Sequence, residues 1–241
     1  MTSREAPAEI QVLFRDPMFL VLCKPAFLPT TGPGAGETLV QRARALDPQA
    51  PKLHPSSRLD AEVTGVVVFA RTREAIQHLL QARRDGAYLR GYLALAASAP
   101  VPSAGDWRAP IALDRRDPRK RATAAAEQPQ ALPAHTRYRT LQALARAALL
   151  WLEPQTGRTH QLRVHAAAAG CPLLGDRPYG GPARVVLDDG SVVSPRRVLL
   201  HCARVGIPDP NGGAPLRFEA APPADLQQIW RALGGAALEL P

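Results

Sequence analysis

A single aspartate stands in the segment Ser56–Gly65, SSRLDAEVTG, directly before a run of β-branched residues. That run predicts a buried strand over residues 65–70, so the carboxylate of Asp60 is expected at the edge of the core. A partly desolvated carboxylate needs a cation, and Arg58 and the distant Arg163 are the candidates. An ionised, paired aspartate can act as nucleophile or base at a sugar carbon without metal or cofactor. Taken alone, however, the segment is better explained by a hydrogen-bonded loop aspartate without chemistry.

A second segment, Gly157–His165, has the sequence GRTHQLRVH and concentrates arginine and histidine. It predicts a helix over residues 159–170 that starts near Gly157 and Thr159, and the positive end of a helix attracts phosphate. The two histidines could instead bind a metal ion. No third soft ligand stands near them and the arginines would repel a cation, so we expect no metal site.

The composition predicts a folded protein with an anionic partner. The chain has 241 residues, 46% of them hydrophobic, and a formal net charge of +9. A positive surface field favours nucleic acid or an anionic membrane, although a GC-rich genome that prefers arginine would give the same excess. No apolar run approaches the roughly 18 residues of a membrane span, so RNA or DNA is the expected partner and a membrane is not.

The cysteines argue for a reducing compartment. Cys23, Cys171 and Cys202 are odd in number and widely separated, which fits neither a disulfide framework nor a zinc cluster. The N-terminal residues lack the apolar core of a signal peptide. We therefore expect a cytoplasmic protein.

The predicted elements describe a mixed α/β (α+β) fold, in which one domain over residues 10–241 follows a disordered lead over residues 1–9. Its large, mostly antiparallel sheet is flanked by helices. The helix that starts at the N-cap Thr72 ends before Gly86. The segment 99–110 is predicted to be a proline-rich excursion. Strands are predicted at 10–14, 19–23, 65–70, 88–96, 135–144, 148–154 and 196–207, and the other helices at 38–46, 159–170 and 222–235.

Basic residues also gather in the segment Asp114–Arg121, which has no apolar periodicity. It predicts a mobile basic loop or hairpin tip that contacts a phosphate backbone, although a solvated loop without function has the same pattern. The residues expected to contact RNA are Arg58, Arg115, Arg116, Arg119, Lys120, Arg121, Arg158, Thr159, His160 and Gln161.

Two of these segments resemble a known family. RLDAEVTG and GRTHQLRVHAAAAGCPLLGDRPYGG are similar to the signature motifs of the RluA-type pseudouridine synthases. VLFRDPMFLVLCKPAFLP resembles the opening strand pair and Lys-Pro of that family, LRGYLALA its tyrosine strand, and LLHCARVGIPDP its closing strand. The resemblance runs from about residue 10 to residue 230.

The resemblance implies the pseudouridine synthase catalytic fold and the isomerisation of specific uridines in structured RNA, either ribosomal or transfer RNA, without a cofactor. It implies that Asp60 is the catalytic aspartate, that Tyr92 stacks on the target base and takes part in proton removal, and that Arg163 pairs with Asp60. From the residues alone, Tyr92 would be read as a strand core residue. A monomer without an N-terminal RNA-binding domain is expected.

The chain departs from the family pattern around the aspartate. Ser57 stands where the family has histidine, Val63 and Thr64 replace Thr-Ser, and Arg90 replaces a common lysine. No catalytic group is lost, but Ser57 and Val63 are expected to change how the loop is held or how RNA is gripped. Two rival functions are an RNA-binding protein without activity and an enzyme that cleaves another glycosidic bond. The second would need a further carboxylate, which neither motif supplies.

Overall fold

The structure is a computed structural model that describes residues 9–32, 36–125, 128 and 130–241. The predicted disordered lead lies outside the described residues except for Glu9. The chain forms two compact units. Unit 1 comprises Met1–Tyr88 and Arg204–Ala220, and unit 2 comprises Leu89–Ala203 and Ala221–Pro241.

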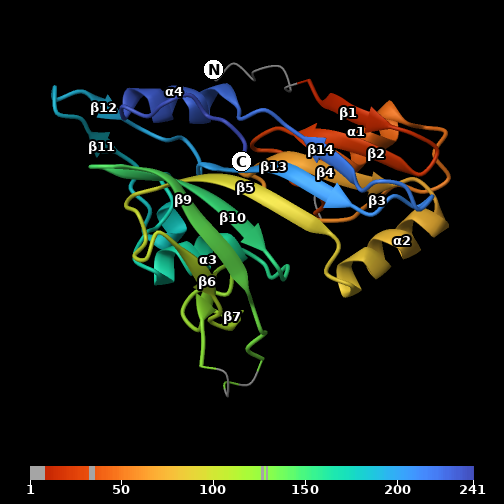
Figure 1. Ribbon diagram of the computed structural model, residues 1–241, viewed down its shortest axis with the longest axis horizontal. Coiled ribbons are helices and arrows are strands. Elements are labelled where there is room, and N and C mark those ends of the chain that lie inside the picture. Colours follow the sequence, from red (N-terminus) through yellow and green to blue (C-terminus); the bar gives the residue numbers. More distant parts are fainter. Residues whose placement is uncertain (1–8, 33–35, 126–127, 129) are drawn as a thin grey trace. The chain divides into compact units, whose positions relative to one another are not determined.

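Unit 1 is built on antiparallel strands. β2 (Phe19–Lys24) pairs with β1 (Gln11–Arg15) on one side and with β4 (Thr64–Ala70) on the other (Figure 1). The two-residue strand β3 (His54–Pro55) also pairs with β4. Nearly every residue of β2 and β4 is buried, which explains why both read as continuous apolar runs rather than as alternating patterns.

Two helices and a C-terminal strand complete unit 1. α1 (Leu39–Leu46) begins with a capping box, and α2 (Arg73–Arg84) begins at the predicted N-cap Thr72, whose side chain accepts a hydrogen bond from the backbone N–H of Ala75. β14 (Leu216–Glu219) pairs antiparallel with the part of β13 that belongs to this unit.

Unit 2 contains the longer strands. β5 (Leu89–Ala96) pairs with β10 (Ala147–Pro154), β10 with β9 (Thr136–Leu144), and β9 with β6 (Ala104–Trp107), all antiparallel. β13 (Leu200–Ile207) starts in this unit and runs on into unit 1. The prediction of a proline-rich excursion was wrong for β6, because that short edge strand is specified by its pairing with β9 rather than by its own sequence.

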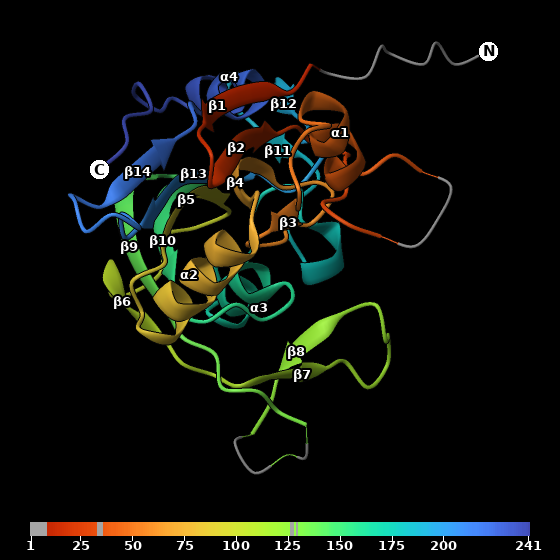
Figure 2. The same cartoon turned by 90° about the vertical axis from the view of Figure 1, so that its right-hand side faces the viewer.

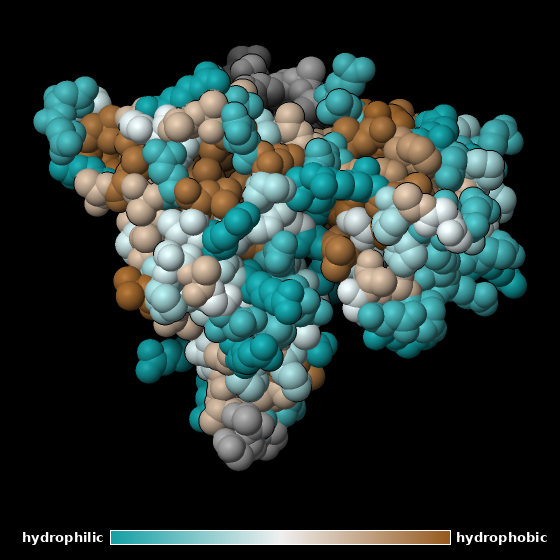
Figure 3. Space-filling view, viewed as in Figure 1, coloured by the Kyte–Doolittle hydropathy of each residue, from teal (hydrophilic) through white to brown (hydrophobic). Residues whose placement is uncertain are grey.

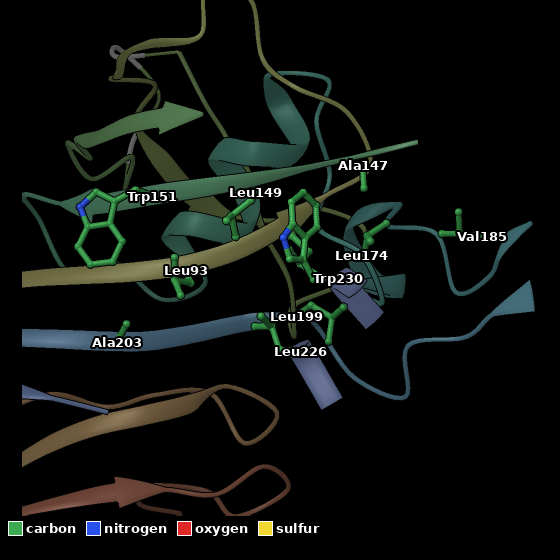
Figure 4. Packing of buried hydrophobic residues seen from close by; sticks show 11 residues of the cluster. Leu93, Ala147, Leu149, Trp151, Leu174, Val185, Leu199, Ala203, Leu226 and Trp230 are labelled. Atoms are coloured by element: carbon green, nitrogen blue, oxygen red, sulfur yellow. The ribbon is translucent and has the colours of Figure 1, made fainter. Parts of the chain in front are cut away.

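The core of unit 2 lies between this sheet and α4 (Ala224–Ala232). Figure 4 shows Trp230 of α4 among Leu149, Leu174 and Leu226, and Trp230 is fully buried. This packing confirms the helix predicted at 222–235, and the apolar side of that helix covers the sheet.

Two small hairpins and two short helices surround the sheet of unit 2. β7 (Ile111–Leu113) pairs with β8 (Arg121–Thr123), and β11 (Val185–Val186) with β12 (Val192–Val193). Figure 2 shows the β7–β8 hairpin beside α3, with its tip directed away from that helix. The hairpin confirms one of the two predicted forms of the basic segment. In Figure 3, the surface over β6 and β7 consists mostly of hydrophilic residues and residues of intermediate hydropathy.

The helix of the second motif is shorter than expected. α3 (Gln161–Ala168) begins two residues after the predicted start, and the 3₁₀ turn Arg177–Tyr179 follows it. The strand predicted from residue 196 begins at Leu200. Overall, the predicted mixed α+β class with mostly antiparallel pairing is confirmed. Among the described residues no helix is long and apolar enough to cross a membrane.

Candidate active site

Asp60 lies in the loop that enters β4, as the sequence predicted, and its side chain is half-buried. Its carbonyl oxygen accepts a hydrogen bond from the backbone N–H of Val63, which closes a tight turn after the aspartate. Immediately before it, the backbone N–H and carbonyl of Leu59 both bond to the hydroxyl of Thr30, at 3.0 and 2.9 Å. The aspartate is therefore carried on backbone that is fixed on both sides.

A buried lysine also fixes the loop that carries Asp60. The side chain of Lys24 is fully buried, and its ammonium donates to the carbonyl oxygens of Pro25, Leu28 and Ala61 at 2.8, 2.7 and 2.9 Å. An ammonium has three donors, and these three carbonyls satisfy them. Because Ala61 directly follows Asp60, Lys24 ties the loop of the aspartate to the end of β2.

The start of the loop is held by residues around α2. The hydroxyls of Ser56 and Tyr88 lie 2.6 Å apart, and the backbone N–H of Ser56 donates to Val68 of β4 at 2.7 Å. Arg83 donates to the carbonyl of Ser56, and its guanidinium lies 4.4 Å from the centre of the Tyr88 ring. Tyr88 thus positions the segment that leads to Asp60.

Tyr92 is buried in β5 of unit 2, opposite Leu152 of β10. The residue before it must be glycine, because a Cβ at Gly91 would lie only 2.0 Å from the ring of Trp151. The indole N–H of Trp151 donates to Glu153 at 2.9 Å. The strand is therefore packed closely against β10 directly beside the tyrosine.

Arg163 of α3 is held by an aspartate that was not predicted. The Nε atom and one terminal nitrogen of its guanidinium donate to the two carboxylate oxygens of Asp176, at 2.8 and 2.7 Å. Asp176 is fully buried and the Arg163 side chain is 7% exposed, so this is an interior ion pair. Gly175, before the aspartate, has a φ of +79°, and a Cβ there would lie 1.9 Å from the carbonyl oxygen of Arg197. Only glycine fits there.

Tyr179 joins the arginine to the basic hairpin. Its ring lies 4.9 Å from the Arg163 guanidinium, within the range of a cation–π contact. Its hydroxyl oxygen accepts a hydrogen bond from the backbone N–H of Arg121 at 2.9 Å and lies 2.7 Å from Nδ1 of His160. His160 caps α3 with a left-handed backbone, φ 57°. A single tyrosine thus contacts the helix start, the arginine and strand β8.

Gln161 was predicted to contact RNA, but it lies in the interior. Its Oε1 accepts from the hydroxyl of Thr156 and the backbone N–H of Arg158, and its Nε2 donates to the carbonyl of His135 and the hydroxyl of Thr136. The four bonds, between 2.7 and 3.0 Å, use the full capacity of the amide. Gln161 therefore holds the loop before α3 against β9.

His165 anchors the other end of the same helix. Its Nδ1 lies 2.9 Å from the hydroxyl of Thr136, and its Nε2 lies 2.9 Å from the carbonyl oxygen of Ala109. Burial lowers the pKa of His165 below its usual value of 6.5, because the imidazolium loses hydration there. His165 is accordingly a neutral structural residue at cellular pH.

The remaining predicted RNA contacts are mainly at the surface. Arg58 and Thr159 are exposed, and Arg158 is half-buried and donates to the carbonyl of Pro133. At the hairpin tip, Arg115, Arg116 and Arg119 are exposed, whereas Lys120 and Arg121 are half-buried.

The two aspartates of the hairpin tip accept hydrogen bonds from residues of the tip itself. Asp114 accepts the backbone N–H groups of Arg116 and Asp117, which lowers its pKa. The side chain of Arg119 donates to Asp117 and lowers the pKa of that carboxyl to about 2. Five basic side chains against two acidic ones keep the tip positive. Within the described part of the chain, no group of histidine, cysteine and acidic residues could hold a metal ion.

Sequence reasoning missed Lys24, Asp176 and Tyr179. Lys24 was read as the end of a strand, and the other two lie in GDRPYGG, which was quoted for the resemblance without a role for either. The glycine before Asp176 was the available signal, since it marks a close backbone approach next to a polar residue.

The chain is similar to proteins of one known family. The model of the RNA pseudouridylate synthase family matches residues 18–168. An uncharacterised RNA pseudouridine synthase of Chloroflexus aurantiacus is 37% identical over 176 residues, which are 73% of this chain and 52% of that protein. The ribosomal large subunit pseudouridine synthase D of Xanthomonas campestris is 36% identical over 241 residues, covering 95% of this chain and 71% of that protein.

Solved structures agree with these sequence matches. The human RNA pseudouridylate synthase domain containing 4 protein superposes with a TM-score of 0.73 at 26% identity, covering 95% of this chain and 94% of that one. The matched part of the chain spans about half the length of the Chloroflexus relative (52%). It spans 71% of the Xanthomonas relative and 94% of the human chain. The predicted family and enzyme class are confirmed by these matches. The chain belongs to the RNA pseudouridylate synthase family, and within it to the RluA type.

Proposed function

We propose that this protein converts specific uridines of structured RNA to pseudouridine, with Asp60 as the catalytic aspartate and with Tyr92 and Arg163 in the roles that the family resemblance implies. The observation that carries the proposal is the fixation of the Asp60 loop. Lys24, Thr30 and the Ser56 contacts hold a half-buried carboxylate in place on a chain with a net charge of +9. RNA binding alone has no use for such an acid, because it repels the phosphates.

The proposed reaction begins when the target uridine is flipped from its stack. Stacking on Tyr92 offsets part of the unstacking free energy, which is on the order of a few kcal/mol. As nucleophile, Asp60 bonds to C1′ while the bond between N1 and C1′ breaks with its electron pair moving to the uracil, and the Asp60–C1′ bond breaks again when C5 of the turned uracil bonds to C1′. As base, Asp60 instead takes the C2′ proton while N1 leaves and returns that proton when C5 bonds to C1′. In both routes C5 loses its proton in a step in which Tyr92 takes part and N1 gains one, so the product is an isomer of the substrate.

Arg163 is proposed to balance the negative charge of Asp60. A guanidinium carries five N–H donors, and the pair with Asp176 accounts for those on Nε and one terminal nitrogen. Asp176 thereby fixes the plane of the guanidinium. A positive charge that is oriented before the reaction stabilises the charge on Asp60 as that charge shifts.

The substrate is proposed to be RNA of the large ribosomal subunit. Relatives from Xanthomonas, Haemophilus and Escherichia bear the name of ribosomal large subunit pseudouridine synthases, and this supports ribosomal over transfer RNA. The positive hairpin tip is proposed to contact phosphates. A monomer acting in the cytoplasm fits this substrate.

The test uses Asp60→Asn, which keeps the size of the side chain and removes its charge. Release of tritium from RNA labelled at C5 of uracil should be abolished, while binding of the same RNA survives. Asp188→Asn is the matched control, since Asp188 is 89% exposed in unit 2 and its removal should leave tritium release unchanged. Turnover by Asp60→Asn close to wild type would refute the catalytic assignment, whereas lost turnover with retained binding would exclude a pure RNA-binding role.

A further inference from the structure

Phe27 combines two unusual features. It is 62% exposed, and it is the one aromatic side chain among the exposed large hydrophobic residues of the described chain. Its backbone has a φ of 62°, in the left-handed region. Single exposed apolar residues are common on protein surfaces, but a bulky residue with a left-handed backbone is an outlier that marks strain.

Buried Lys24 anchors the loop that carries Phe27. Its ammonium binds the carbonyls of Pro25 and Leu28, so two of its three bonds bracket Phe27 in the chain. Leu28 is buried, whereas Phe27 beside it is exposed. The loop is thus anchored on both sides of a strained residue whose ring contributes little to the core.

The same lysine connects this loop to the aspartate. Its third bond goes to Ala61, the residue after Asp60, and Thr30 bonds to Leu59, the residue before it. The Phe27 loop and the Asp60 loop therefore form one structure within unit 1.

We infer that Phe27 is a stacking platform for an unpaired nucleobase of the RNA, next to the uridine on which Asp60 acts. This inference rests on the proposed function. Flipping a uridine leaves its neighbours without a stacking partner, and every base has a face that stacks on an aromatic ring. Arg58, exposed on the same fixed structure two residues before Asp60, supplies a cation for the adjoining phosphate.

A protein partner fits the surface less well. Phe27 is followed after Leu28 by half-buried Pro29 and buried Thr30, and then by exposed Thr31 and Gly32. A lone ring beside small polar residues does not make the contiguous apolar area that a stable protein interface needs. Aromatic stacking of a base requires only the ring.

The test replaces the ring with residues that tolerate a positive φ. Phe27→Gly and Phe27→Asn should have a Tm no lower than wild type, because they relieve the strained backbone. Both should weaken binding of an in vitro transcript of large-subunit ribosomal RNA by about tenfold, and Phe27→Tyr should bind like wild type. Leu80→Ala is the control, since Leu80 is 49% exposed on α2 of the same unit and should leave affinity unchanged.

Binding is measured in the Asp60→Asn background, so the outcome does not depend on catalysis. If the unaltered protein binds the transcript but releases no tritium, the proposed function fails while the role of Phe27 is still decided. Wild-type affinity of Phe27→Gly and Phe27→Asn would overturn the inference, and so would a tenfold loss in Phe27→Tyr. The inference would also be overturned if the unaltered protein self-associates and the Phe27→Gly and Phe27→Asn variants lose this self-association but keep their RNA affinity. That result would assign the ring to a contact with a second copy of the chain.

Discussion

The interior pair between Arg163 and Asp176 leads to a prediction about stability. Asp176 is fully buried, the Arg163 side chain is 7% exposed, and two bonds of 2.8 and 2.7 Å join them. Asp176→Ala leaves a guanidinium in the interior without its carboxylate. Arg163→Met keeps the length of the side chain and leaves the carboxylate without its cation.

Each single substitution should lower the free energy of unfolding by about 3–5 kcal/mol, since a buried charge then lacks compensation. The double variant removes both charges. Its loss of unfolding free energy should be well below the sum of the losses in the two single variants, with a coupling energy of roughly 2 kcal/mol or more. The free energy of unfolding of a folded protein is about 5–15 kcal/mol in total, so either single variant loses a large share of its stability.

Urea unfolding followed by tryptophan fluorescence measures these differences. Asp188→Ala is the control, because the pair of Arg146 and Asp188 has side chains 48% and 89% exposed and should contribute less than about 1 kcal/mol. Tritium release, measured where Asp176→Ala is still folded, should fall because Arg163 has lost its orientation. Additive losses in the double variant, or a loss from Asp176→Ala no larger than that of the control, would refute the reasoning.

Three further predictions concern a titrating histidine, the hairpin and the tyrosine. Burial places the pKa of His165 below 6.5, so the unfolded chain binds the proton more readily and stability declines as the pH falls below that value. Urea midpoints of His165→Asn should therefore change less between about pH 7.5 and 5.5 than those of wild type, and equal changes would contradict this. Replacing Arg115 and Arg116 together by Ala should reduce the slope of log affinity against log salt by about 0.7 to 0.9 for each lost phosphate contact, while the single-turnover rate at saturating enzyme stays near wild type. An unchanged slope would make the tip a solvated loop. Tyr92→Phe should bind RNA but turn over poorly, while Tyr92→Ala should lose both, and full activity of the Phe variant would exclude a chemical role for the hydroxyl.

Local patterns in the sequence determined the main elements. β2 and β4 were predictable because a strand buried on both faces needs an unbroken apolar run, and α2 because Thr72 and Gly86 mark its two ends. Asp60, Tyr92 and Arg163 were named through the motifs that resemble a family, and only for Asp60 and Arg163 did residue chemistry point the same way.

Such patterns did not predict the short strands. β6 and β14 have four residues each and lie among glycine and proline. Their hydrogen bonds go to β9 and β13, which the sequence of the short strand does not specify. Tertiary pairing decided them.

The supports of the candidate site were likewise decided only by the tertiary structure. Lys24 reads as the end of a strand until Ala61, 37 residues on, brings a carbonyl to its ammonium. Nothing in the sequence around Asp176 shows that it is buried against Arg163, and nothing around Phe27 shows that its ring is exposed on a left-handed backbone. In each case the deciding quantity is whether a polar or apolar group is buried and what faces it. That depends on segments far apart in the chain, whereas residue type and spacing depend only on neighbours.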